Sequence, residues 1–203
     1  MSRYTGPRLK VLRALGTELP GLTTKKAERR PYPPGQHGQA RKKLTEFAVR
    51  LHEKQKVKMN YGVSERQLRT LMVEAKTSGG QTGHKLIELL ERRLDNVVFR
   101  AGWARTIPAA RQLVNHGHVL VNGKRVDIAS FRVDKGQTIS LREKSRELGS
   151  VAAGAQVADG FQTPWLEVNR QAGTAVVSNL PDETSALFTV NLQLVVEFYS
   201  QRV

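Results

Sequence analysis

The spacing of apolar residues changes once along the chain, near residue 118, and this change constrains the fold more than any other feature. Between residues 44 and 117 the apolar side chains recur every three or four residues, which is the period of an amphipathic helix. From 119 to 142 they alternate, which is the period of a half-buried strand. The pattern predicts an α+β protein: a mainly helical domain with an inserted unit made of a helix-turn-helix and a small curled antiparallel sheet.

Local signals predict where the helices begin. Thr45 is a candidate N-cap, and Ser64 with Gln67 has the capping-box pattern in front of an apolar stripe. Thr106 is placed to cap a further helix with a proline in its first turn. The run from 82 to 102 is also helical in pattern, and the sequence leaves open whether a break near Arg92 divides it.

Turn signals divide the rest of the chain. Asn122-Gly123 between β-branched runs predicts a tight hairpin. Residues 145–163 are rich in Ala, Gly and Ser and predict a loosely held connection, and the apolar segment at 192–199 predicts a helix or an extended segment that packs on the helices of 45–90. The expected organisation is an N-terminal arm at 1–43, a helical domain at 44–91 completed by the C-terminal segment, an α+β unit at 92–150, and a connection with the C-terminal segment at 151–203.

The N-terminal arm is basic and broken by prolines. Its segment "RPYPPGQHGQARKK" holds three prolines, four Lys or Arg residues, one histidine and no acid, and only a short helix at 8–16 is expected before it. Such a segment is either a flexible basic linker or an arm that becomes ordered on a partner. Prolines lower the entropy lost on docking and glycines allow close approach of the backbone, which favours the second interpretation.

The charge indicates a polyanionic partner. Lys and Arg outnumber acids by 33 to 18, and residues 1–60 alone carry 15 basic and 4 acidic side chains, whereas residues 149–203 carry 2 and 5. Nucleic acid and an anionic membrane are the usual partners of such a chain. The absence of cysteine excludes disulfides and thiolate metal sites, and no apolar run is long enough for a transmembrane helix. The N-terminus lacks the pattern of a signal peptide or import leader, so we expect a protein made and used in one compartment.

Polar side chains are expected to point outward from the predicted helix-turn-helix and hairpin once the apolar residues face inward. Lys and Arg neutralise phosphates, while Asn, Gln and His reach 2′-hydroxyls and base edges. The alternative is a solvated face of a small domain. These residues are Arg93, Arg105, Arg111, Gln112, His116, His118, Asn122, Lys124 and Arg125.

A second basic block lies on the helix that follows Thr45. Arg50, Lys54 and Lys58 share one face with Lys56 beside them, and the acids within the helix are too few to pair with them all. The alternative is again a solvated face, supported by the Glu46–Arg50 pair at i,i+4 spacing. We expect this block to contact phosphates.

At these residues the chain resembles a known family. The segments "RLDNVVFR", "ARQLVNHGHVLVNG" and "VDIASFRV" resemble the S-four-type RNA-binding domain, and "PPGQHGQ", "LHEKQKVKMNYGVSERQ" and "LVVEFYS" resemble the small-subunit ribosomal protein S-four family of bacterial type. The segments "MSRYTGPR" and "LPGLT" resemble its cyanobacterial and plastid branch. The resemblance covers almost the whole chain and is weakest at 144–190. It implies an inserted S-four-type domain and an "PPGQHG" arm ordered against RNA.

The same resemblance implies a function. It implies a non-enzymatic, structural role: primary binding of 16S rRNA at a multi-helix junction of the 5′ domain, nucleation of 30S body assembly, and contact with protein S-five that influences translational accuracy. The expected rRNA-binding residues are Arg3, Arg8, Lys10, Arg13, Lys25, Lys26, Arg29, Arg30, Gln36, His37, Arg41, Lys42, Lys43, Arg50, Lys54, Lys56, Lys58, Arg66, Arg69, Lys85, Arg93, Arg105, Arg111, Gln112, His116, His118, Asn122 and Lys124. The acidic C-terminal quarter is expected to face a basic protein neighbour through Glu183, Glu197 and Tyr199.

Other classes of function fit less well. An RNA-modifying enzyme would need a catalytic domain for which the chain has no room, and a helix-turn-helix regulator of DNA would need a dimer seam, which is absent from the pattern. No cofactor, small-molecule substrate or homo-oligomer is expected. His116 and His118 make an incomplete metal site, and relatives with an N-terminal cysteine cluster hold a metal there that this chain cannot hold. We expect a place in the ribosome of the bacterial cytoplasm, with the plastid stroma as the alternative.

Overall fold

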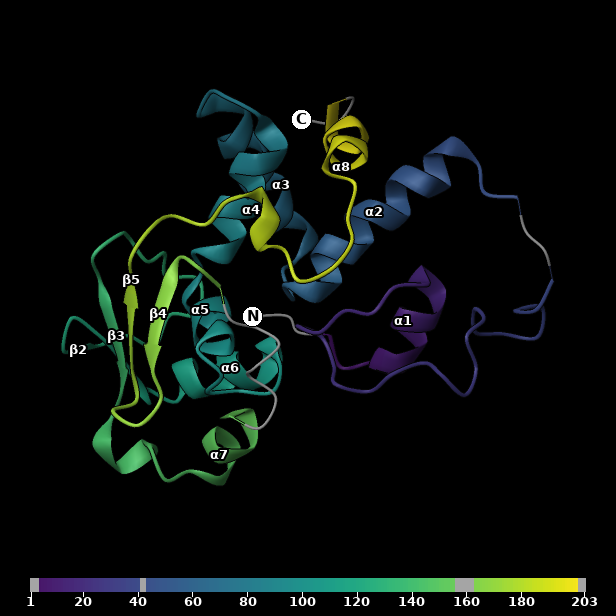
Figure 1. Ribbon diagram of the computed structural model, residues 1–203. Helices are drawn as coiled ribbons and strands as arrows, with labels where there is room; N and C mark the ends of the chain where they lie inside the picture. The colour runs from purple at the N-terminus through teal and green to yellow at the C-terminus, as the bar shows by residue number, and fades with distance from the viewer. Residues whose placement is uncertain (1–3, 41–42, 156–162, 201–203) are drawn as a thin grey trace. The chain divides into compact units, whose positions relative to one another are not determined.

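Two parts of the chain fold as separate units. The computed structural model describes residues 4–40, 43–155 and 163–200, without the side chain of Glu183. The first unit, the helical unit, comprises Met1–Leu86 and Ala186–Val203; the second, the mixed unit, comprises Ile87–Ser185 (Figure 1). The helical unit is therefore built from both ends of the chain, with the mixed unit inserted between them.

Capping side chains begin the helices of the helical unit where the sequence predicted them. Thr45 accepts a hydrogen bond from the backbone of Ala48 at the start of α2 (Glu46–Asn60). Ser64 and Gln67 form both bonds of the capping box of α3 (Glu65–Thr77). The unit also contains α1 (Arg8–Leu15), the first turns of α4 (Thr82–Glu91) and α8 (Leu192–Ser200). The predictions of these helices are confirmed.

The C-terminal segment is a helix that packs on α2 and α3, as the prediction that it completes the helical domain required. Val195 and Phe198 of α8 are buried, as are Leu68 and Met72 of α3. α3 is thus in contact with residues more than a hundred positions away in the sequence. The sequence left open whether this segment is a helix or extended, and the structure shows that it is a helix.

A break at Arg92-Arg93 separates α4 from α5 (Leu94–Arg100). There Arg93 leaves the helical conformation and forms an isolated bridge with Arg132, and the amide of Leu94 donates to the carbonyl of Phe131 at 2.8 Å. Pairing with a distant segment, rather than a proline or glycine, interrupts the helix. α6 (Ile107–Asn115) follows and packs on α5, with Thr106 capping it as predicted.

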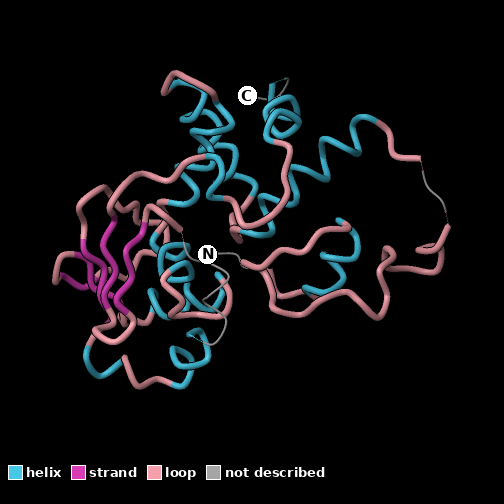
Figure 2. The backbone as a smooth tube through the Cα atoms, viewed as in Figure 1, coloured by secondary structure: helices cyan, strands magenta, loops and turns pink. Residues whose placement is uncertain are grey.

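The mixed unit carries one antiparallel sheet, shown in magenta in Figure 2. Its strands are β1 (Val119–Val121), β2 (Lys124–Arg125), β3 (Thr138–Leu141), β4 (Leu166–Asn169) and β5 (Thr174–Val177), in the spatial order β2-β1-β3-β5-β4. The predicted turn at Asn122-Gly123 is confirmed, since both residues have positive φ, 48° and 77°, as a type I′ hairpin requires. The α+β fold class is confirmed.

The sheet corrects two expectations about residues beyond 142. Strand β5 pairs with β3, so 166–177 belong to the sheet and the mixed unit extends to Ser185, past the expected limit at 150. The described part of the expected loose connection is ordered as well: it holds the 3-10 turn η1 (Glu143–Ser145) and α7 (Gly149–Ala155), and a second 3-10 turn, η3 (Glu183–Ser185), ends the unit. Gly154 packs so closely that a Cβ there would lie 2.6 Å from the amide of Ala104.

Candidate nucleic-acid interface

The basic residues of α2 are paired inside the helical unit. Arg50 Nε lies 2.9 Å from Glu197 of α8 and its Nη1 lies 3.4 Å from Glu46, while Lys56 pairs with Glu53 at 2.6 Å. The hydrogen bond from Arg50 to Glu197 raises the pKa of the guanidinium. The expectation that this block pairs poorly with its own protein is wrong, because part of the acids come from other helices, which spacing within α2 cannot show.

Glu65 is the centre of the largest of these pairings. One carboxylate oxygen lies 2.9 Å from Lys54 Nζ and 3.1 Å from Lys58 Nζ, and the other accepts from the Tyr199 hydroxyl at 2.8 Å. Burial alone would raise the pKa of Glu65, but the hydrogen bonds from Lys54, Tyr199 and Lys58 lower it to about 2. Lys54 is only 4% exposed, so its expected contact with phosphate is corrected to a structural role.

The structure places the expected protein-contacting residues of the C-terminal quarter in different environments. Tyr199 is 3% exposed and bonded to Glu65, so the expectation that it faces a neighbouring protein is corrected. Glu197 is half-buried and paired with Arg50. The side chain of Glu183 lies outside the described residues.

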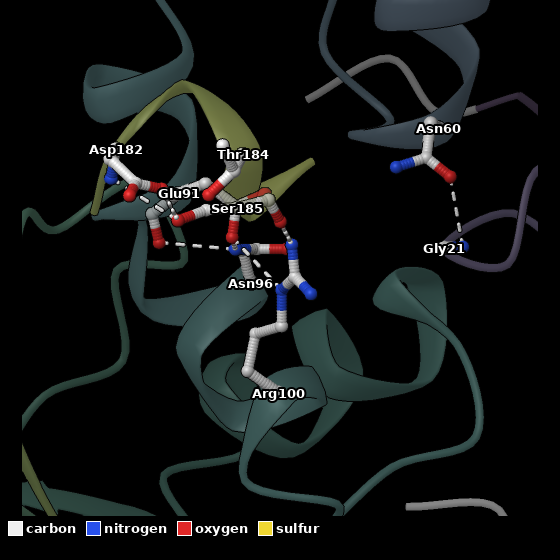
Figure 3. Close-up of polar contacts among 8 residues, drawn as sticks. All are labelled: Gly21, Asn60, Glu91, Asn96, Arg100, Asp182, Thr184 and Ser185. Atoms are coloured by element: carbon white, nitrogen blue, oxygen red, sulfur yellow. Dashed lines mark hydrogen bonds and ion pairs between the residues drawn. The ribbon is translucent and has the colours of Figure 1, made fainter. Parts of the chain in front are cut away.

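The N-terminal segment is anchored on α2 by buried side chains. Leu19 and Leu22 are buried, and between them the amide of Gly21 donates to Asn60 Oδ1 at 2.9 Å (Figure 3). Arg8 Nη1 donates to the carbonyl of Leu22 at 3.4 Å. This part of the arm is therefore held by contacts within the protein, and Arg8 takes part in them.

Arg13 fixes the start of the Pro-rich segment. Its Nε donates to the carbonyl of Tyr32 at 3.0 Å, its Nη2 donates to that of Pro33 at 3.4 Å, and its guanidinium carbon lies 5.1 Å from the Tyr32 ring centroid. Around this anchor most of the expected RNA-binding side chains are exposed. They are Lys10, Lys25, Lys26, Arg29, Arg30, Gln36, His37 and Lys43.

Gln36 and His37 lie at the tip of a tight turn. The amide of Gly38 donates to the carbonyl of Gly35 at 3.2 Å, which makes Gln36 and His37 the two central residues. Gly38 is required here, because a Cβ would lie 2.0 Å from the carbonyl oxygen of Pro33. The turn presents an amide and an imidazole to solvent beside the basic residues. Arg3, Arg41 and Lys42 lie outside the described residues.

Further basic residues are carried by α3 and α4. Arg66 and Arg69 are exposed on α3, on the side away from its buried stripe, and Lys85 of α4 is half-buried. Their positions are compatible with the expected contacts with RNA.

Asp95 of the mixed unit binds two of the expected RNA-contacting arginines. Arg93 approaches it with Nε at 3.2 Å and Nη2 at 3.0 Å, and Arg111 with Nε at 3.0 Å and Nη2 at 2.6 Å. Arg93 is only 5% exposed, so the expectation that it points outward is wrong: the fully buried carboxylate of Asp95 holds it inside. Arg111 is half-buried and takes part in the same cluster.

The other predicted residues of this unit form an exposed polar surface on α6, its C-terminal turn and the β1–β2 hairpin. His118 is half-buried, with Nδ1 2.9 Å from Ser145 Oγ, and Arg105 Nε donates to the carbonyl of Ala153 at 3.2 Å while its side chain remains exposed. Asn122 accepts from the amide of Thr138 through Oδ1. The exposed residues of this surface are Arg105, Gln112, His116, Asn122, Lys124 and Arg125.

Sequence reasoning missed three basic residues next to this surface. Arg142, Lys144 and Arg146 are exposed on and around η1, and the amide of Arg142 donates to the carbonyl of His118 at 2.9 Å. The alternation of basic residues in "REKSR" was an available signal. Of these three residues, only Arg146 lies in the predicted loose connection at 145–163.

Arg100 is a buried arginine that belongs to the framework rather than the interface. Its Nε and Nη2 lie 2.9 and 2.7 Å from the two oxygens of Glu91, which also accepts from Asn96 Nδ2 at 2.7 Å (Figure 3). Arg100 also donates to the carbonyl of Ser185. The hydrogen bonds from Thr184 and Ser185 to Asp182 lower the pKa of that carboxyl and shape the turn that presents this carbonyl.

Neither a metal centre nor a membrane span is found in the part of the chain that the structure describes. No three His, Cys, Asp or Glu side chains gather there as ligands for one ion, and the rings of His116 and His118 are 6.1 Å apart. None of the described helices combines the length and hydropathy needed to cross a bilayer.

Comparison with known proteins agrees with the division of the chain. Residues 3–91 match the family model described as the ribosomal protein S4/S9 N-terminal domain, and residues 92–139 match the S4 domain. The small ribosomal subunit protein uS4 of Methylobacillus flagellatus is 52% identical over 205 residues, and that of Rippkaea orientalis is 52% identical over 203 residues, with the whole of each chain covered. The protein uS4B of Nitrosomonas europaea is 48% identical over 205 residues, again with both chains fully covered. The chain belongs to the uS4 family of small ribosomal subunit proteins.

Proposed function

We propose that the chain is a structural constituent of the small ribosomal subunit that binds the 5′ domain of 16S rRNA at a multi-helix junction. It acts there as a primary binding protein that nucleates assembly of the 30S body. Its role is to hold RNA rather than to catalyse a reaction. Contact with protein S-five, through the acidic C-terminal quarter, is the route by which it influences translational accuracy.

One observation carries this proposal: the basic residues divide into an internal and an external set. The cations of α2 and the Asp95 and Glu91 clusters are neutralised by carboxylates of their own unit. Arg105 before α6, the basic residues of the β1–β2 hairpin and of η1 with its flanks, and most of those of the N-terminal segment are exposed. A set of exposed cations interspersed with Gln, His and Asn matches the chemistry of an RNA backbone, in which phosphates alternate with 2′-hydroxyls.

The proposal predicts steep salt dependence. Each phosphate neutralised by Lys or Arg releases counterions, so the affinity falls with salt in proportion to the number of contacts. With six or more phosphates engaged, the affinity is expected to fall roughly a thousandfold between about 50 and 200 mM salt.

The test is a chemical footprint of the full chain on 16S rRNA at two salt concentrations. The wild-type chain should protect a single multi-helix junction in the 5′ domain, and the variant Arg105→Gln/Lys124→Gln should weaken that protection. Lys135→Gln is the control, because Lys135 is exposed, bonded to Asn179 and outside the proposed interface. Diffuse protection, or equal binding to duplex DNA, would count against the proposal and favour a DNA-binding regulator.

A further inference from the structure

A small cavity in the helical unit is lined mostly by basic residues. It has a volume of about 260 Å³ and lies between α1 and the loop that follows residue 25. The residues around it are Leu9, Arg13, Lys26, Ala27, Arg29 and Arg30. Four of these six side chains are cationic and none is acidic.

Backbone geometry brings these side chains together. Leu9 and Arg13 are one turn apart on α1, so they lie on the same side of that helix. The amide of Arg30 donates to the carbonyl of Ala27 at 3.1 Å, which closes a turn. The bonds from Arg13 to the carbonyls of Tyr32 and Pro33 hold the end of the loop against the helix. The cavity is thus shaped by one backbone turn and by two hydrogen bonds from the Arg13 side chain to backbone carbonyls.

The positive charge of the cavity is not neutralised by the protein. Lys26 lies 3.7 Å from Glu28, but these side chains are 63% and 78% exposed, and such a pair is worth little. Arg13 is bonded to carbonyl groups and an aromatic ring. In the part of the chain that the structure describes, no carboxylate makes an ion pair with Arg13, Arg29 or Arg30. Like charges that line one cavity repel each other, and an anion placed between them would relieve that repulsion.

We propose that this cavity binds one phosphate group of the RNA backbone and is a defined subsite of the interface. The inference rests on the proposed function and adds the position of one phosphate to it. The guanidinium groups of Arg29 and Arg30 match the oxygens of a phosphodiester with paired N–H donors, and Arg13 adds its positive charge. The apolar walls of Leu9 and Ala27 suit the carbon side of a ribose. The volume lies below the usual range of small-molecule pockets, which begins at about 300 Å³, so a single phosphate with part of its sugar fits better than a whole nucleotide.

The subsite would also connect RNA binding to the Pro-rich turn. Arg13 lines the cavity and holds Tyr32 and Pro33, and these residues lead directly into the turn with Gln36 and His37 at its tip. A phosphate seated on Arg13 and Arg29 therefore fixes the base of the turn. Gln36 and His37 would then reach nucleotides next to that phosphate.

The first test compares the salt dependence of two charge-matched variants of the full chain on 16S rRNA. Arg29→Gln should make the slope of log affinity against log salt less steep by about 0.9, the contribution of one phosphate contact. The loss of affinity between about 50 and 200 mM salt should then be about threefold smaller than in the wild type. Lys135→Gln, which removes the same charge far from the cavity in sequence, should leave the slope unchanged. Equal slopes for Arg29→Gln and the wild type would overturn the inference while leaving the proposed function intact.

The second test observes the arginine side chains directly by NMR, with inorganic phosphate and a short oligoribonucleotide as probes. Both probes should shift the Nε resonances of Arg13 and Arg29, and the Arg13 shift should be lost in Arg29→Gln. A shift with inorganic phosphate but none with the oligoribonucleotide would identify a free-anion site and overturn the assignment to RNA. Failure of the proposed function is a different result, since the wild-type chain would then leave the 16S rRNA junction unprotected.

Discussion

At the scale of single residues, the buried pair of Glu91 and Arg100 supports the mixed unit most directly. Glu91 is fully buried and Arg100 is 3% exposed, and together they bond Asn96 of α5 and the carbonyl of Ser185. The pair links α4, α5 and the end of the unit. Removing one partner leaves a buried charge without compensation, which typically costs about 3–5 kcal/mol.

We therefore expect Glu91→Gln to lower the free energy of unfolding by about 3–5 kcal/mol in urea titrations. The double variant Glu91→Met/Arg100→Met is the informative comparison, because it leaves no buried charge. It should be less destabilised than either single variant. A double variant that loses the sum of the two single losses would show that the two side chains act independently.

Glu65 gives a prediction about pH. Its pKa is about 2 in the folded protein against an ordinary 4.5, so the stability it contributes is complete above pH 4.5 and is lost as the pH falls toward 2. The side chain is 46% exposed, so screening reduces the effect to about 1 kcal/mol. The wild type should lose more stability than Glu65→Gln between pH 4.5 and 2.5, measured by urea unfolding. Parallel curves for the two proteins would contradict the ion pairs of Glu65.

The residues that were predicted correctly from sequence are those governed by their neighbours in the chain. The Ser64–Gln67 capping box and the Asn122-Gly123 turn follow from local backbone geometry, and both are present. The exposure of Lys54 and Arg93 differs from the prediction because their partners decide it. Glu65 lies across a loop on another helix, and Asp95 is a fully buried carboxylate that also binds Arg111 of α6. A polar side chain at an outward position of a helix is exposed only if no other element covers it.

At the scale of elements, a buried backbone amide of the N-terminal segment is bonded to α2. Asn60 accepts from the amide of Gly21, and both groups are buried. Asn60→Ala would leave that N–H without a partner at a cost of about 1–3 kcal/mol. We expect faster hydrogen exchange for residues 19–22 in this variant and unchanged exchange in α6. Asn115→Ala, at an exposed asparagine, is the control, and accelerated exchange at 19–22 in that variant would argue against the role of Asn60.

The sheet shows that the sequence of a strand does not specify which strand becomes its neighbour. The strands at 166–169 and 174–177 join the sheet with β5 beside β3 and β4 beside β5, an order that their own sequences do not contain. Pairing of Ala175 with Ile139 joins segments more than thirty residues apart, and only the assembled sheet specifies that neighbour. For the same reason the mixed unit extends to Ser185, while the local pattern indicated an end near 150.

At the scale of the whole molecule, the basic residues that produce the net charge of +15 have two different roles. Some hold the protein together: the buried or half-buried Lys54, Arg93 and Arg100 each bind a carboxylate of their own unit. Others, such as Lys10, Arg105 and Lys124, are exposed. Exposed cations contribute little to folding, and their mutual repulsion opposes it, so their value lies in binding a polyanion.

This division predicts that stability and RNA binding respond to different substitutions. Arg93→Gln should lower the free energy of unfolding by about 1–3 kcal/mol, since it removes two hydrogen bonds from the buried Asp95, and should leave the salt slope of 16S rRNA binding unchanged. Lys124→Gln should do the reverse. Its free energy of unfolding should stay within about 0.5 kcal/mol of the wild type, and its slope of log affinity against log salt should be less steep by about 0.9, the contribution of one phosphate contact. Urea titration and a salt series of binding curves on the same two proteins make the comparison. If Arg93→Gln reduced the slope and Lys124→Gln did not, the exposed hairpin would not be the RNA-binding surface, and the arginines at Asp95 would have to leave their carboxylate to reach the phosphates.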